Sequence, residues 1–132
     1  MSDVAAFASI PITAAIKTSE TNPHLDPTGY METLITAGPA GLRVDSINII
    51  IGDDSVGYPS DTCVAMFLHN GSSAFLYKVI YPLSQLDPES TQLVEFELRD
   101  LAIVLENGWS LRFCSNDGGS FHISTTFAAR FG

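Results

Sequence analysis

Turn-forming residues divide this chain into short pieces, and their spacing constrains the fold more than any other feature of the sequence. The strongest turn signals are Gly-Pro-Ala-Gly, Asn-Gly, Asn-Gly and Asn-Asp-Gly-Gly, at positions 38–41, 70–71, 107–108 and 116–119. Between such turns, apolar and polar side chains alternate over stretches of roughly five to ten residues, as in strands with one buried face. A chain interrupted this often leaves little room for helices, so the sequence predicts an all-β fold.

The alternation predicts about eight or nine strands joined by turns. The first is an edge strand or an extended arm, because Pro11 lies near its start and proline cannot donate a ladder hydrogen bond. The second half of residues 42–51 is apolar on both faces, which predicts a position in the middle of a sheet. The predicted strands cover residues 10–17, 30–37, 42–51, 62–69, 74–81, 94–99, 101–105, 109–114 and 121–131.

Two Asn-Gly pairs predict β-hairpins, because both residue types tolerate positive φ in a tight turn. Asn70-Gly71 is expected to join residues 62–69 to 74–81, and Asn107-Gly108 to join 101–105 to 109–114. Asn70-Gly71-Ser72 also matches a glycosylation sequon, but a tight turn is the interpretation adopted for it. The segment 91–106 has a helical alternative that its lack of an apolar helical stripe disfavours.

A single antiparallel sandwich accommodates these elements, with a jelly roll of about eight strands as the first choice. The chain has 132 residues, 45% of them hydrophobic and 16% charged, which suits one domain with a substantial core. We expect an N-terminal arm at residues 1–10 and one β-sandwich domain at 11–132. The apolar segment 4–16 could add a strand to the sheet edge of a neighbour, dock on its own domain or be a disordered tail.

The charge balance argues against polyanionic partners. Six Lys and Arg face fifteen Asp and Glu, for a net charge of −9, so the molecule repels nucleic-acid backbones and anionic membrane surfaces. No apolar run approaches the length of about 20 residues that spans a bilayer. An acid, Asp3, stands where a secretory signal would carry Lys or Arg, so synthesis in the cytoplasm is expected.

The two cysteines show no metal-binding spacing. Cys63 and Cys114 each lie in an apolar run, so both are predicted to be buried thiols. A disulfide between them stays an open alternative, because the sequence does not give the distance between their Cα atoms.

The three histidines do not form a recognisable catalytic or metal-binding pattern. His24 lies in a proline-bounded loop, His69 ends a strand, and His122 lies inside the last strand. The chain contains no pair of histidines one residue apart, so a metal site of the cupin type is excluded. Each histidine is therefore interpreted as a surface residue or a satisfied core residue, and no catalytic, cofactor-binding or metal-ligating residue is predicted.

Two groups of acids are possible sites. Asp53, Asp54 and Asp61 could offer oxygen ligands to calcium, but they fit a solvated loop better, because no calcium-binding motif accompanies them. Glu95 and Glu97 fall on one face of a strand, roughly 7 Å apart, a separation that glycosidases use. The interpretation adopted for them is the wet face of that strand. Phosphate-loop and dinucleotide-binding fingerprints are absent from the sequence.

Aromatic residues near the C-terminus are predicted to fill the core, since a domain of this size needs large side chains between its sheets. A sugar-stacking platform is the alternative use for them. The residues concerned are Trp109, Phe113, Phe121 and Phe127, and the alternation places Phe121, Ile123, Thr125 and Phe127 on one face.

From about residue 22 to residue 131, the chain resembles a family of small β-structured virion proteins of tailed bacteriophages. Four stretches carry the resemblance: LDPTG at 25–29, TAGPAGLRVDSI at 36–47, MFLHNG at 66–71 and LENGWSLR at 105–112. The chain differs from common members at Asn107-Gly108, where a Pro-Gly type of turn is usual, and in its acidic 52–61 loop. The resemblance implies a jelly-roll-like sandwich that oligomerises and coats or cements a capsid, with no catalytic residues and no cofactor.

On that basis we expect a non-enzymatic head decoration or cement protein, trimeric, located in the virion and bound to the major capsid protein or another virion protein. Tail or fibre attachment is the nearest variant. A carbohydrate-binding sandwich is the second class, and it predicts an exposed aromatic pair beside polar groups. An enzyme is the third class, and it requires a cleft that holds a histidine with a strongly perturbed pKa and a carboxylate partner.

Overall fold

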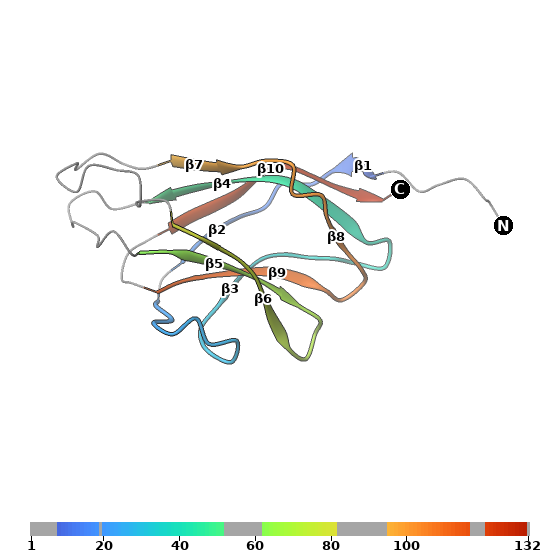
Figure 1. The fold of residues 1–132 in the computed structure, drawn as a ribbon. Helices are drawn as coiled ribbons and strands as arrows, with labels where there is room; N and C mark the ends of the chain where they lie inside the picture. Colours follow the sequence, from blue (N-terminus) through green and yellow to red (C-terminus); the bar gives the residue numbers. More distant parts are fainter. Residues whose placement is uncertain (1–7, 19, 52–61, 82–94, 117–120, 132) are drawn as a thin grey trace.

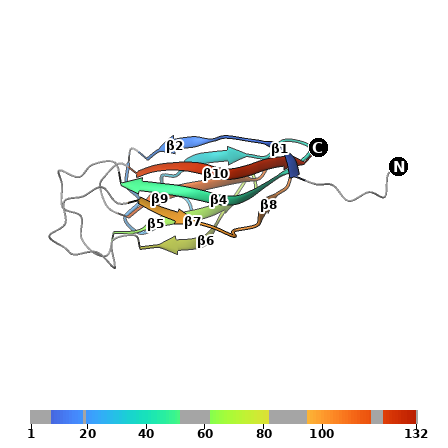
Figure 2. The ribbon, with the colours of Figure 1, turned by 90° about the horizontal axis from the view of Figure 1, so that it is seen from above.

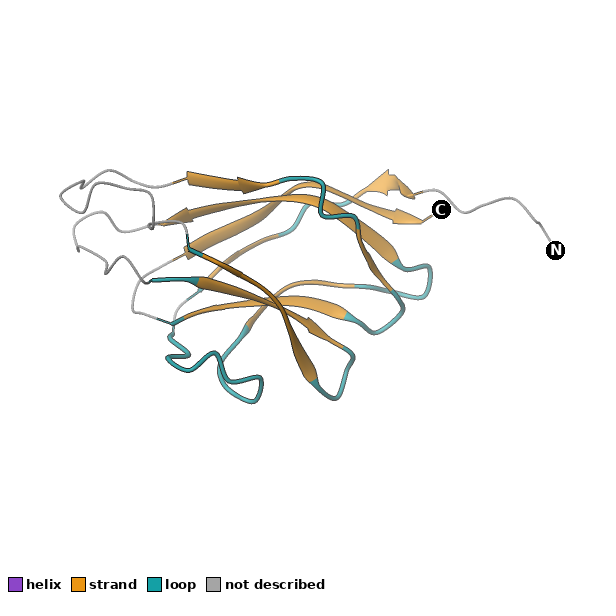
Figure 3. Ribbon diagram, viewed as in Figure 1, coloured by secondary structure: helices purple, strands orange, loops and turns teal. Residues whose placement is uncertain are grey.

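The computed structural model describes residues 8–18, 20–51, 62–81, 95–116 and 121–131. These residues form ten strands and no helix, which confirms the all-β prediction (Figure 3). The strands lie in two antiparallel sheets that pack face to face as a sandwich (Figure 1). Within the same residues, no helix is long and apolar enough to cross a membrane.

The larger sheet has six strands, with β10 and β4 at its centre. Figure 2 shows these two strands side by side, with β2 beyond β10 and β7 beyond β4. Both β1 and β2 pair with β10, and both β7 and β8 pair with β4. The strands are β1 (Ala8–Pro11), β2 (Ala15–Lys17), β4 (Leu42–Ile51), β7 (Glu95–Leu98), β8 (Ile103–Leu105) and β10 (Phe121–Phe131).

The smaller sheet has four strands in the order β3-β9-β5-β6. In this order β9 and β5 are central, while β3 and β6 form the two edges. The strands are β3 (Glu32–Thr36), β5 (Val64–His69), β6 (Ala74–Ile80) and β9 (Ser110–Ser115).

β1 and β2 follow one another along β10, and β7 and β8 follow one another along β4. Each of these pairs is one interrupted strand, called a strand path below. Between β1 and β2, the Ile12 amide donates to the Ala128 carbonyl at 2.9 Å, so the chain keeps following β10. Between β7 and β8, the Leu101 amide donates to the Asp45 carbonyl at 2.9 Å, while positive φ angles at Asp100 and Ala102 break the strand. Counting each interrupted path once leaves eight paths, which is the expected number.

The order of these paths is that of a jelly roll. With the paths numbered along the chain, their order across the larger sheet is first, eighth, third and sixth. Across the smaller sheet the order is second, seventh, fourth and fifth. This arrangement winds two Greek keys into two sheets, so the predicted jelly-roll sandwich is confirmed. β4 lies between β10 and the β7–β8 path, as its apolar second half predicted.

The strand prediction also holds across the ambiguous segment. Residues 95–98 and 103–105 are β7 and β8, so the helical alternative is wrong there, and residues 91–94 lie outside the described part. Of the predicted arm at 1–10, the first seven residues lie outside the described part as well, and Ala8–Pro11 forms β1 against β10. The boundaries of that arm and of the domain at 11–132 stay predictions.

The first predicted hairpin is present, but its turn works differently from the prediction. β5 and β6 pair antiparallel, with His69 opposite Ala74, so the loop holds four residues. Gly71 has a positive φ of 98°, whereas Asn70 does not. Instead, the Asn70 side-chain Oδ1 accepts hydrogen bonds from the amides of Ser72 and Ser73, at 2.9 and 2.8 Å. Asn70 therefore acts as a side-chain cap of the loop.

The second predicted hairpin is wrong. Asn107-Gly108 does form a turn, in which the Trp109 amide donates to the Glu106 carbonyl at 3.0 Å and Gly108 has a φ of 85°. The strands on either side belong to different sheets, since β8 pairs with β4 and β9 pairs with β3 and β5. An Asn-Gly turn can join two strands that pair with each other or two strands that lie in different sheets. The pairing of those strands with distant parts of the chain decides which of the two arrangements forms.

The main core lies between the two sheets. It takes Ile47 and Ile49 from β4, Ile123 from β10, and Leu111 and Phe113 from β9, all nearly inaccessible to water. A second, smaller cluster lies on the outer face of the four-stranded sheet, where Leu25 and Met31 pack against it; its buried members are Ala65, Phe67 and Cys114. The segment between β2 and β3 therefore covers part of that outer face.

Strict alternation fails on the two central strands. Leu42 and Val44 are buried in β4, and so are Ile47 and Ile49, so the buried positions change parity between 44 and 47. The pairing with β10 is irregular at the same level, between Thr125 and Ala128. A bulge there shifts the facing of the residues beyond it, which brings Leu42 and Val44 into the same core as Ile47 and Ile49.

Candidate functional site

The three histidines lie on three different parts of the fold. His24 is exposed in the β2–β3 segment, His122 is exposed on β10, and His69 is half-buried at the end of β5. His69 and His122 belong to different sheets. Within the described ranges, no three His, Cys, Asp or Glu side chains gather as metal ligands would.

The acids considered as sites divide into two groups. Asp53, Asp54 and Asp61 lie outside the described residues. Glu95 and Glu97 are both exposed on β7, and Glu97 accepts a hydrogen bond from the Arg99 Nη2 at 3.1 Å. The interpretation of Glu95 and Glu97 as the wet face of the strand is confirmed.

Three of the four aromatic residues predicted to fill the core contribute to it. Phe113 and Phe121 are fully buried, and Trp109 is half-buried against the main cluster. Phe127 is 53% exposed, so that prediction is wrong; the irregular pairing around it turns its side chain to the surface. Because Trp109 packs on the core, Trp109→Ala would disturb folding as well as any sugar contact.

The two cysteines are buried, as predicted, and no disulfide joins them. Burial raises the pKa of the Cys114 thiol to about 11, and the neighbouring Cys63 adds to the shift. At neutral pH this thiol is therefore protonated, and it lacks the thiolate character of a catalytic nucleophile.

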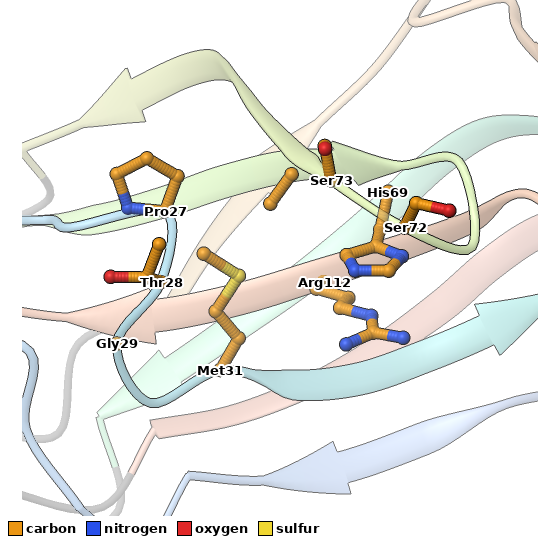
Figure 4. A pocket seen from close by; sticks show the side chains of 9 residues that line it. Pro27, Thr28, Gly29, Met31, His69, Ser72, Ser73 and Arg112 are labelled. Carbon is orange, nitrogen blue, oxygen red and sulfur yellow. The ribbon is translucent and has the colours of Figure 1, made fainter.

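An open groove of about 530 Å³ lies on the outer face of the four-stranded sheet (Figure 4). Three distant segments form it: the end of the β2–β3 segment, the β5–β6 hairpin and the middle of β9. The lining residues are Pro27, Thr28, Gly29, Met31, His69, Ser72, Ser73, Ala74 and Arg112. The sequence does not reveal this groove, because its walls meet only when β9 pairs with β5.

A hydrogen-bonded asparagine shapes one wall of the groove. The Nδ2 of buried Asn22 donates to the carbonyls of Asp26 and Tyr30, at 2.8 and 3.2 Å, and its Oδ1 accepts from the Asp26 amide at 2.9 Å. A Cβ on Gly29 would lie 2.6 Å from the same Nδ2, so a larger residue here would displace the Asn22 side chain from its hydrogen bonds. These contacts hold the segment 26–30 against the sheet.

The groove carries hydrogen-bond donors. Arg112 is half-buried, and its Nε donates to the Ser110 Oγ at 3.0 Å. The Nδ1 of His69 accepts the Gly71 amide at 3.0 Å, so the proton of the neutral ring resides on Nε2. Burial, together with the charge of Arg112, lowers the pKa of His69 from its usual 6.5, and the ring is neutral at pH 7.

Apolar side chains are exposed along β6, the edge strand of the smaller sheet. Phe75, Leu76 and Tyr77 are 51%, 52% and 48% exposed, and Tyr81, just beyond the strand, is 50% exposed. These four residues are called the β6 surface below. They lie on a sheet edge, because β6 pairs with β5 alone among the described strands.

Other exposed apolar residues are scattered over the six-stranded sheet. Val104 lies on β8, Phe96 on β7 and Ile10 on β1, whereas the β6 surface concentrates its members on one strand and the residue after it. Isolated apolar side chains are normal on a protein surface. The β6 surface is therefore the stronger candidate for contact with another protein.

Comparisons with known proteins give matches among solved structures. No family model matches the chain, and no curated protein matches it. Two solved structures, each described as a pentameric capsid protein isolated from metagenomic phage sequences, are similar to it at 17% identity, with TM-scores of 0.48 and 0.44. Each match covers 89% of this chain, which spans only 59% and 62% of those two chains. Likeness at this level does not bear on the activity or oligomeric state of this chain.

Proposed function

We propose that this protein is a non-enzymatic structural component of a tailed-bacteriophage virion, a decoration or cement protein of the head. In this proposal it works as a symmetric homo-oligomer, a trimer, that binds the major capsid protein or another virion protein. The resemblance of residues 22–131 to small phage virion proteins supports the assignment, and the β6 surface is the structural observation that carries it.

The β6 surface has the character of a protein contact. Fully burying a Leu or Phe side chain contributes about 1.5 to 3 kcal/mol, and three adjacent residues of β6 each leave about half of their area exposed. Covering them would contribute a few kcal/mol per subunit on this scale. In a closed ring every subunit makes the same contact, so a modest energy per subunit is sufficient for a stable oligomer.

The edge of β6 favours side-chain contacts over continued strand addition. Tyr77 has no partner in the register with β5, since Leu76 pairs with Phe67 and Lys78 with Met66. Such a bulge and an edge lysine both hinder indefinite edge-to-edge pairing. These features therefore favour a closed oligomer over an open fibre of strands.

The net charge of the chain also disfavours non-specific association between copies. At a net charge of −9, copies repel one another at long range, so only a contact with good short-range packing can hold them together. Pairing along β5 holds the backbone of β6 in place before any contact forms, which reduces the entropy lost on contact.

Sedimentation velocity on matched variants, with mass spectrometry of particles of the phage that carries this gene, tests the proposal. We expect the wild type to sediment as a trimer and to occur in the particles, because the apolar contact closes a ring. The double variant Leu76→Ser/Tyr77→Ser should sediment as a monomer, while Val104→Ser, which is equally exposed on the other sheet, should remain a trimer. Circular dichroism checks that each variant is folded.

A wild type that stays monomeric at every concentration and is absent from the particles would contradict the proposal. A pentamer dissociated by the β6 double variant would correct the stoichiometry and leave the contact in place. An oligomer that Val104→Ser dissociates and the double variant does not would move the contact away from β6.

A further inference from the structure

We propose that the groove beside the β5–β6 hairpin is a carboxylate-binding site, and that its occupant is an Asp or Glu side chain from a second copy of this chain. This inference rests on the proposed homo-oligomer and adds to it the polar contact that fixes how two copies meet. Arg112 is the residue expected to receive the carboxylate.

Arg112 differs from the other cations of the chain. Arg43 and Arg99 are paired with Asp45 and Glu97, at 2.6 and 3.1 Å. The three remaining cations, Lys17, Lys78 and Arg130, are exposed to water. Arg112 alone among the described cations is half-buried without an ion pair to a described carboxylate, a placement that costs free energy until a counter-charge arrives.

The guanidinium of Arg112 is oriented but not saturated. Its Nε is held by the Ser110 Oγ at 3.0 Å, which fixes the plane of the group and leaves the two terminal nitrogens for a ligand. A guanidinium presents its N–H groups as a planar fork that matches the two oxygens of a carboxylate. Figure 4 shows this side chain on the same side of the groove as His69.

The remaining polar groups of the groove also suit an anion. His69 can donate from Nε2, because its Nδ1 is already occupied by the Gly71 amide. The side-chain hydroxyls of Ser72 and Ser73 line the groove as well, and no carboxylate is among its lining residues. The Thr28 hydroxyl is not available as a donor to a ligand, because it already donates to the Asp26 Oδ1 at 2.8 Å.

A second copy is the occupant that the surroundings favour. Every copy carries fifteen acids against six Lys and Arg, so an approaching copy presents carboxylates in excess. The groove also continues into the β6 surface: Ala74 lines the groove, and Leu76 follows it two residues later on the same strand. Alternate residues of a strand share a face about 7 Å apart, so a copy that covers Leu76 comes within reach of Arg112.

The test uses acetate as the probe of the groove and Arg130→Gln, a change at an exposed arginine of the other sheet, as the matched control for Arg112→Gln. Acetate replaces chloride at constant ionic strength while NMR follows the arginine Nε–H and His69 signals. We expect saturable shifts in the wild type and in Arg130→Gln, and none in Arg112→Gln. In sedimentation, Arg112→Gln should weaken the oligomer by about tenfold or more, and Arg130→Gln should leave it unchanged.

Three results would overturn the inference. Equal responses to acetate and chloride would show that the groove does not select carboxylates. Acetate shifts that persist in Arg112→Gln would place the binding elsewhere. Acetate binding at Arg112 with an unchanged oligomer in Arg112→Gln would reject the second copy as occupant, while the proposed function would still stand on the β6 double variant.

Discussion

Asn22 shows how one side chain can organise a segment that has no regular structure. The backbone amide of Asn22 donates to the Ser115 carbonyl of β9 at 2.8 Å. Its side chain forms hydrogen bonds with the backbone of Asp26 and Tyr30. The side chain thereby satisfies backbone groups that have no strand partner. One buried residue links the segment before β3 to the sheet beneath it and sets the wall of the groove.

We predict that Asn22→Ala lowers the free energy of unfolding by about 2 to 4 kcal/mol, because it removes three hydrogen bonds and leaves backbone groups unpaired. Urea denaturation followed by circular dichroism measures the change. Asn107→Ala is the control, since Asn107 is exposed and no described side-chain hydrogen bond involves it; a change of about 0.5 kcal/mol or less is expected there. Equal stability of both variants would refute the role of Asn22.

Among the elements, β10 has the largest influence on what the surface displays. Phe121 and Ile123 face the core near its start, Ala128 does so near its end, and the pairing with β4 is irregular between them. Thr126 has no partner in the register with β4, and its hydroxyl donates to the Ser46 Oγ at 2.6 Å. The irregularity lets one long strand contribute to the core at both ends while Phe127 faces the solvent.

Deleting Thr126 should abolish folding or cost more than about 4 kcal/mol, because a slip of one residue turns the rest of β10 to the wrong face. Thr126→Ala keeps the chain length and loses only the hydroxyl contact, so we expect a cost of about 1 kcal/mol or less. Thermal unfolding of both variants provides the measurement. A deletion variant as stable as Thr126→Ala would show that the irregularity does not set the register.

At the scale of the whole molecule, the two sheets share one core. Side chains from β4 and β10 of one sheet interlock with those from β3, β5 and β9 of the other in a single cluster. The inner face of each sheet is buried by the other sheet, so each sheet needs the other to exclude water from that face. The β6 surface and the groove are therefore both presented by one cooperative unit.

Both sheets are accordingly predicted to unfold together in one transition. Far-UV circular dichroism reports on all strands, whereas the fluorescence of Trp109, the one tryptophan of the chain, reports on packing against the core. We expect the two signals to give the same urea midpoint in one sample. Midpoints that differ beyond error would show that the sheets, or a segment packed on them, unfold separately.

The groove illustrates what sequence analysis does not reveal. Arg112 and His69 are unremarkable as sequence positions, and they meet only because β9 and β5 pair with Arg112 opposite Phe67 and Ser110 opposite His69. The β6 surface was missed for a related reason. An apolar strand has the same sequence pattern at the edge of a sheet and at its centre. Only the order of the strands shows that β6 is an edge strand with exposed side chains.

The amino-acid sequence by itself determined that the chain forms short strands, where most of them begin and end, and that they make a sandwich, because backbone preferences and alternating burial act locally. The tertiary structure decided which strands became neighbours. In that structure the Asn107-Gly108 turn connects strands of different sheets. Phe127 faces the solvent, and β6 lies at the edge of its sheet. These outcomes depend on pairing between distant segments, where bulges and strand order outweigh the local pattern.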